Sequence, residues 1–152
     1  MPLREQFTEA LKGAMKAGDK PRVSTVRLIQ AALKDKDIEA RGAGKDPIPE
    51  EEILALLQKM TKQRQESLAI YEANGRPELA AGEREEIAII AHYLPKQLDD
   101  AETEKAVADA VAATGAASVK DMGKVIAQLR ASYAGRMDFA KASGLVKAKL
   151  AG

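Results

Sequence analysis

Apolar residues recur every three to four positions along most of the chain, which is the period of a helix that buries one face. Proline and glycine interrupt this pattern, and the segments between them predict about seven helices. No segment shows the strict alternation of apolar and polar residues that marks a half-buried strand. We therefore expect an all-α fold. The expected helices cover residues 3–17, 19–41, 49–73, 77–94, 99–114, 118–133 and 138–150.

Pro95 marks the expected boundary between two helical domains. Proline cannot continue a helix, and the residue before it favours an extended conformation. We place an N-terminal, hairpin-type domain of about four helices over residues 1–95. A C-terminal three-helix domain is expected over residues 96–152.

Capping residues are expected at several helix ends. Gly18 is placed to end the first helix, because glycine readily adopts the left-handed conformation of a C-terminal cap. Each helix of the C-terminal domain has its own start signal. These signals are Asp99 or Asp100 for the first helix, Ser118 with Asp121 as a capping box for the second, and Asp138 for the third.

Composition limits what can hold this fold together. The chain has 152 residues and no cysteine, so a packed apolar core must stabilise it without disulfides or thiolate metal sites. Its longest strongly apolar run, residues 87–91, is far shorter than the roughly 20 residues of a membrane-spanning helix. The first residues lack the apolar stretch of a signal peptide. We therefore expect a cytoplasmic protein that does not associate with membranes.

Candidate catalytic chemistry is sparse. His92 is the only histidine, and its place in the last turn of the fourth expected helix suits the helix dipole, so we expect neither a catalytic nor a metal-binding role for it. The acidic residues 50–52 open the third helix and are expected to form a solvated face. Glu83 and Glu86 lie three apart on one helical face, where a buried ion pair or a partner contact is the alternative to solvation.

No arrangement of serine, lysine and glycine residues matches a hydrolase or a nucleotide-binding loop. The segment 42–46 contains Gly42, Gly44 and Lys45, but it lacks the spacing of a phosphate-binding loop and follows a helix rather than a strand. We therefore expect no cofactor, no metal, no catalytic residues and no independent enzymatic activity.

Charge is nearly balanced over the whole chain, with 24 Lys and Arg against 23 Asp and Glu, but it is uneven along it. Residues 96–117 hold two basic and five acidic residues, whereas residues 118–152 hold seven basic and two acidic residues, a net charge of +5. Such a basic module is typical of polyanion binding, and a solvated lysine face is the alternative. The candidate RNA-binding residues are Lys120, Lys124, Arg130, Arg136, Lys141, Lys147 and Lys149.

Helical spacing predicts how some of these basic residues are arranged. Lys120 and Lys124 are four apart and should share one helical face, and Lys141 and Lys149, eight apart, should also lie close together. We expect Arg136, like these lysines, to point away from the apolar stripe.

Several motifs together resemble those of the GatB/YqeY family. They are Gly75-Arg76-Pro77-Glu78-Leu79 ahead of Glu83 and Glu86, Tyr93-Leu94-Pro95 before Gln97, Asp121-Met122-Gly123-Lys124-Val125, and Gly135-Arg136 before Asp138. The chain resembles the small members of this family over essentially its whole length. The resemblance implies an N-terminal helical hairpin domain and a C-terminal domain similar to the tail domain of the B subunit of tRNA-dependent amidotransferases. That tail domain is thought to contact tRNA.

Three hypotheses follow from the charge pattern and the resemblance. The first is a tRNA-binding accessory module of translation, related to glutamine-dependent tRNA amidotransferases, which are carbon–nitrogen ligases with glutamine as amide donor. The second is a protein-interaction adaptor that works through the N-terminal hairpin with Glu83 and Glu86. The third is an amidotransferase component. The expected partners are tRNA and an amidotransferase or another translation-related protein.

Overall fold

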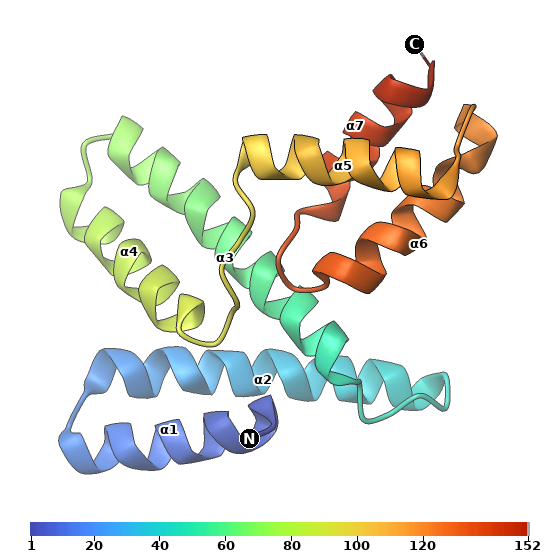
Figure 1. Cartoon of the computed structure of the whole chain (residues 1–152). Helices are drawn as coiled ribbons and strands as arrows, with labels where there is room; N and C mark the ends of the chain where they lie inside the picture. The colour runs from blue at the N-terminus through green and yellow to red at the C-terminus, as the bar shows by residue number, and fades with distance from the viewer. Residues whose placement is uncertain (152) are drawn as a thin grey trace. The chain divides into compact units, whose positions relative to one another are not determined.

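The computed structural model describes residues 1–151 and confirms an all-α fold over them (Figure 1). The elements are α1 (Leu3–Ala17), α2 (Lys20–Gly42), α3 (Glu50–Ala73), α4 (Pro77–Ala91), α5 (Asp100–Thr114), the 3₁₀ helix η1 (Val119–Asp121), α6 (Met122–Tyr133) and α7 (Phe139–Ala151). Most expected ends agree with these bounds to within one residue, and the exceptions are residues 92–94 and 118–121. Within the described residues, no helix combines the length and apolar character that crossing a membrane requires.

Packing divides the chain into two units, Met1–Leu94 and Pro95–Gly152. Each unit has its own cluster of buried apolar side chains. The division falls at the Leu94–Pro95 bond, so packing assigns Pro95 to the C-terminal unit.

The N-terminal unit consists of two helical hairpins. α1 packs along α2 and α3 packs along α4, while α2 also contacts both α3 and α4 (Figure 1). Phe7, Ile29, Leu57 and Ile90, one from each helix, meet in its core and are each at most 1% exposed. Gly18 ends α1 in the left-handed conformation with φ of 68°, as expected.

α4 ends at Ala91, three residues before its expected end. The backbone N–H groups of His92 and Tyr93 donate to carbonyls three residues earlier, at 3.3 and 3.0 Å, so the chain tightens into a turn. This turn carries Tyr93 into the core, where its ring meets the Phe7 ring edge to face with centroids 5.0 Å apart. The expected end was wrong because residues 93 and 94 keep the apolar spacing of α4 after the backbone has left the helix.

The C-terminal unit packs α5, α6 and α7 around one core. Its most buried side chains, each at most 2% exposed, include Val107, Val125, Leu129, Met137 and Val146. The core thus takes residues from α5, α6 and α7 and from the loop before α7.

Side-chain caps begin two of these helices, as expected. Asp99 and Glu102 form a capping box at α5, because Asp99 Oδ1 accepts the Glu102 N–H at 2.7 Å and Glu102 Oε1 accepts the Asp99 N–H at 3.1 Å. Asp138 Oδ1 accepts the N–H groups of Ala140 and Lys141, at 3.0 and 3.2 Å, at the start of α7.

Candidate nucleic-acid interface

The chain just before α6 forms η1 instead of the first turn of an α-helix. Asp121 explains the difference, because its Oδ2 accepts the backbone N–H groups of Ala117 at 2.9 Å and Ser118 at 3.3 Å. These hydrogen bonds hold the pKa of Asp121 below its usual value. Lys120 therefore lies on η1 and Lys124 on α6, so the α-helix expected from residue 118 begins only at Met122.

Arg136 is built into the C-terminal unit. Its Nε donates to the carbonyl oxygen of Lys96 at 3.1 Å, and its own carbonyl accepts the N–H of Leu98 at 2.8 Å. The guanidinium also lies 5.8 Å from the centre of the Tyr133 ring. The half-buried Arg136 thus ties the loop before α7 to the segment before α5.

Two further candidates make contacts within the unit. Lys141 forms an ion pair with Asp100 of α5, and the hydrogen bond from its ammonium group to that carboxylate raises the pKa of Lys141. The Arg130 guanidinium lies over the Phe139 ring, 5.1 Å from its centre. These contacts join α5, α6 and α7, so both cations contribute to packing as well as to surface charge.

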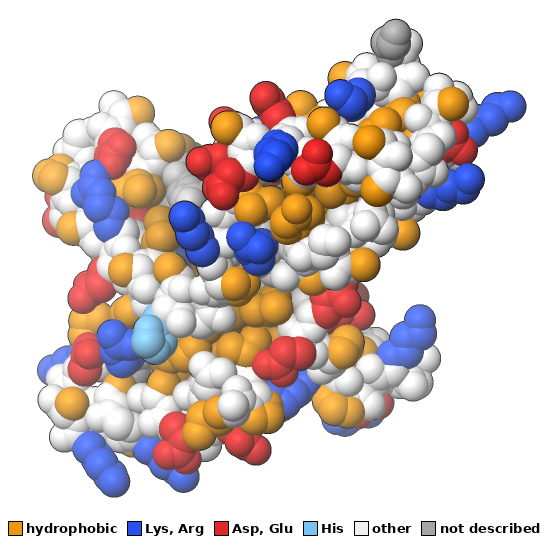
Figure 2. Space-filling model, in the orientation of Figure 1, with side chains coloured by type: hydrophobic (Ala, Val, Ile, Leu, Met, Phe, Trp, Pro, Cys, Tyr) orange, Lys and Arg blue, Asp and Glu red, His pale blue; other side chains and the backbone are white. Residues whose placement is uncertain are grey.

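The other four candidates, Lys120, Lys124, Lys147 and Lys149, are exposed, and we call them the lysine cluster. Within residues 1–151 their one ion pair is a long contact of 3.9 Å between Lys124 Nζ and Asp121 Oδ1. α6 and α7 are joined by the short loop 134–138, and η1 contacts α7, so the start of α6 lies beside the end of α7. The four lysines therefore gather at one end of the unit, and Figure 2 shows Lys and Arg side chains over that end.

Comparison with known proteins identifies the family, because YqeY-like proteins match residues 4–150. This chain belongs to the YqeY-like family. The resemblance inferred from its motifs is therefore confirmed.

Curated relatives of the YqeY-like chain include proteins named "altered inheritance of mitochondria protein 41, mitochondrial". The one from Vanderwaltozyma polyspora is 30% identical over 119 residues, which cover 74% of this chain and 62% of the relative. The one from Lachancea thermotolerans is 36% identical over 84 residues, which cover 55% of this chain and 43% of the relative. The chain thus spans less than two thirds of the length of these relatives.

Acidic candidates of the YqeY-like chain contribute to its own packing. Glu50 is exposed, as expected, but its Oε1 also accepts the backbone N–H of Leu3 at 2.7 Å. Glu86 Oε2 accepts a hydrogen bond from Arg64 Nε at 2.8 Å. Of the possibilities considered for this acidic pair, Glu86 therefore forms an ion pair. One carboxylate oxygen of Glu83 is buried and accepts no hydrogen bond from the described residues.

His92 is exposed at the C-terminal cap of α4, where its ring meets the edge of the Tyr93 ring with centroids 5.1 Å apart. Across residues 1–151, no three His, Asp or Glu side chains lie close enough together to hold a metal ion. The fold thus brings no set of metal ligands to His92.

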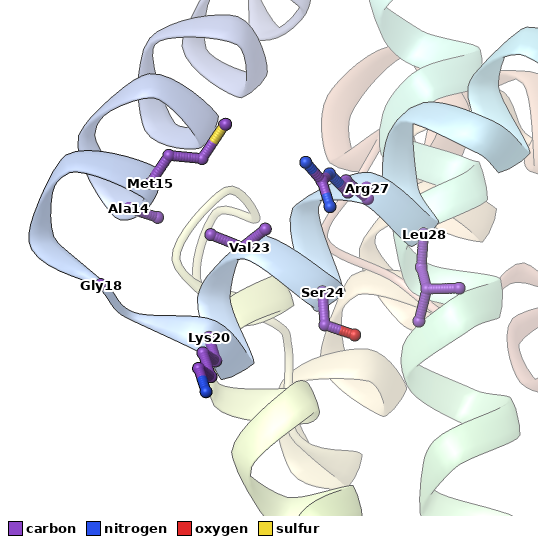
Figure 3. A pocket seen from close by; sticks show the side chains of 8 residues that line it. All are labelled: Ala14, Met15, Gly18, Lys20, Val23, Ser24, Arg27 and Leu28. Carbon is purple, nitrogen blue, oxygen red and sulfur yellow. The ribbon is translucent and has the colours of Figure 1, made fainter.

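A groove of about 670 Å³, which the sequence pattern did not predict, lies between the end of α1 and the start of α2 (Figure 3). The side chains of Met15 and Val23 extend into the space between these helices, and Lys20 and Arg27 belong to its α2 side. A second hollow of about 350 Å³ lies between the same two helices nearer their other ends. The feature of the sequence that could have indicated this surface is the basic residue at every seventh position of residues 20–41.

Proposed function

We propose that this YqeY-like protein is a tRNA-binding accessory module whose C-terminal unit contacts RNA while a partner supplies catalysis. The observation that carries the proposal is the lysine cluster, Lys120, Lys124, Lys147 and Lys149, which gathers exposed positive charge at one end of the unit. Residues 118–152 hold seven basic and two acidic residues, and this excess of positive charge attracts a polyanion such as RNA.

Lysines of this kind suit contact with phosphates better than contact with base edges. A lysine ammonium is a point charge on a flexible stem, and it does not impose the planar, two-pronged geometry that reads a base. Contacts to phosphate carry no sequence information and weaken with salt. Arg130, Arg136 and Lys141 should contribute less, because their charged groups are already engaged within the unit.

The proposal relates the protein to glutamine-dependent tRNA amidotransferases. Its support is the similarity of the motifs in the C-terminal unit to the tail domain of their B subunit, together with the cationic surface described above. In this role the protein holds tRNA, and the carbon–nitrogen ligase chemistry belongs to the partner enzyme. Ammonia release from glutamine by the purified chain would instead favour a catalytic component.

Filter binding of unfractionated tRNA to the full chain tests this proposal. The test variant replaces the four residues of the lysine cluster by glutamine. We expect it to bind all tRNAs more weakly. The slope of log affinity against log salt should become shallower by about 3, since each lost phosphate contact reduces that slope by roughly 0.7–0.9.

The matched control replaces four exposed lysines of the N-terminal unit by glutamine, namely Lys12, Lys16, Lys45 and Lys59. It removes the same charge and should leave most of the binding intact. The proposal is wrong if tRNA fails to bind at low salt, or if the control loses as much affinity as the test variant. Either result would favour the protein-interaction adaptor.

A further inference from the structure

The groove between α1 and α2 follows one face of α1. Arg4 and Thr8 line the second hollow and Met15 lines the first, and these α1 residues are separated by four and seven positions. These separations place the three residues on one side of α1. Both hollows therefore open along the same side of the hairpin, and together we call them the groove.

Four basic residues, Lys20, Arg27, Lys34 and Arg41, line the α2 side of this groove and are exposed; we call them the basic row. They are seven residues apart, which is almost two helical turns, so they form a row on one face of α2. Successive members lie about 10 Å apart along the helix axis, and the whole row spans about 31 Å.

The basic row has little acidic compensation. Within residues 1–151 only its last member, Arg41, forms an ion pair, with Asp46 at 3.1 Å. Among the described lining residues the single carboxylate is that of Asp37, and both its oxygens bond to Arg4 at 2.8 Å. The groove therefore presents net positive charge to whatever binds it.

Apolar side chains, two of them the buried Phe7 and Leu33, contribute to the surface between the basic row and α1. Met15 and Val23 extend into the first hollow (Figure 3), and Phe7 and Leu33 line the second. Met15 remains 56% exposed, and Ile38, which lies within the basic row, is 51% exposed. A nucleic-acid backbone offers no apolar stripe to cover these side chains, whereas an amphipathic helix does.

We propose that the groove between α1 and α2 binds an amphipathic helix of a partner protein that carries an acidic residue at every seventh position beside an apolar stripe. A helix packed nearly parallel to α2 repeats its contacts every seven residues, which matches the spacing of the basic row. Acidic side chains would face the row, and the apolar stripe would cover Met15 and Ile38. This surface lies wholly within the N-terminal unit, so it is independent of the proposed RNA contact.

The test uses the full chain and two labelled helical peptides of about 24 residues, long enough to span the row. The acidic peptide carries glutamate at four positions seven apart beside leucine, and the basic peptide carries lysine at those positions. We expect saturable binding of the acidic peptide by fluorescence anisotropy. The double variant Arg27→Glu with Lys34→Glu should weaken it at least about tenfold. The basic peptide should bind that variant better than the original chain.

Two further variants separate this proposal from general attraction of anions. Lys16→Glu with Lys59→Glu makes the same charge change on exposed residues of α1 and α3 that do not line the groove, and it should leave binding unchanged. Met15→Ser should weaken binding several-fold. The proposal is overturned if the acidic peptide does not bind, if the Lys16 and Lys59 control weakens binding as much, or if the basic peptide shows no preference for the charge-reversed variant. It is also overturned if a uridine oligonucleotide displaces the peptide while Met15→Ser has no effect.

Discussion

Arg4 and Asp37 form a two-pronged ion pair that joins α1 to the last third of α2. Nη1 and Nη2 of the guanidinium each donate to one carboxylate oxygen at 2.8 Å. Asp37 also accepts the backbone N–H of Ile48 at 2.9 Å, and Arg4 donates to the Ile48 carbonyl at 3.1 Å. The pair therefore fixes the loop that leads into α3. The hydrogen bond from Arg4, with the Ile48 N–H, lowers the pKa of Asp37 to about 2.

The N-terminal unit should lose stability as the pH falls from about 5 to about 2. The pKa of Asp37 is lower in the folded than in the unfolded chain, so its stabilisation is complete above the unfolded value and is lost as pH approaches the folded value. Asp37→Asn should lower the free energy of unfolding at pH 7 by about 1 kcal/mol, given that Arg4 is partly exposed. Thermal unfolding followed by circular dichroism from pH 2 to 7 measures both effects. Asp35→Asn, at an exposed position, is the control, and equal pH profiles for the two variants would contradict the prediction.

Two buried threonines should respond oppositely to replacement by valine. Thr25 is 1% exposed and its hydroxyl has no hydrogen-bond partner among the described residues, so Thr25→Val should raise the stability of the N-terminal unit by about 1 kcal/mol. Thr103 is 4% exposed and donates to the Asp99 carbonyl at 2.7 Å, so Thr103→Val should lower the stability of the C-terminal unit by about 1 kcal/mol. Amide hydrogen exchange on the full chain reports each unit separately. Changes of the same sign at both sites would refute this account.

Glu86 should matter more to stability than its neighbour Glu85. Glu86 pairs with Arg64, whose side chain is 15% exposed and also donates to the Met60 carbonyl at 3.1 Å. Glu86→Ala would leave the Arg64 charge without its carboxylate and should cost about 2 kcal/mol in urea unfolding. Glu85 is exposed, and Glu85→Ala should change stability by less than about 0.5 kcal/mol. Similar costs at the two positions would show that the Arg64 pair contributes little.

Arg136 and Lys124 should separate folding from RNA binding. Arg136→Gln removes the hydrogen bond to the Lys96 carbonyl and should destabilise the C-terminal unit by about 1 kcal/mol. Lys124→Gln alters a side chain that is 70% exposed and should leave the thermal midpoint unchanged while weakening tRNA binding. Thermal unfolding and tRNA titration of both variants provide the comparison. A loss of stability in Lys124→Gln would remove the distinction between the two residues.

Fragments 1–94 and 95–152 should each be helical when prepared separately. Each holds complete helices around a separate buried cluster, so cutting at Leu94–Pro95 divides neither core. Circular dichroism of the two fragments and limited proteolysis of the full chain test this. A first proteolytic cut in the middle of α3, before any cut near residues 95–100, would argue against two independent units.

The amino-acid sequence by itself determined the helices and most of their ends. Gly18, Asp99 and Asp138 act where the pattern predicted, because a cap satisfies backbone groups within a turn of itself. Phe7 and Ile29 are buried because they recur at helical spacing with other apolar residues, and helical periodicity fixes which side chains share a face. Family membership was likewise indicated by sequence motifs alone, since these motifs are runs of neighbouring residues.

Only the tertiary structure decided which charged side chains form ion pairs or hydrogen bonds with distant parts of the chain. Arg4 and Asp37 are 33 residues apart, and Arg136 and Lys96 are 40 apart, so no local pattern could pair them. The charge pattern of the sequence did not distinguish among the seven C-terminal cations. In the folded unit, Arg136 donates a hydrogen bond to the Lys96 carbonyl, whereas Lys120 is exposed. The groove between α1 and α2 likewise exists only because two helices meet. Helix formation depends on neighbours within four residues, whereas grooves and long-range ion pairs depend on how separate helices pack.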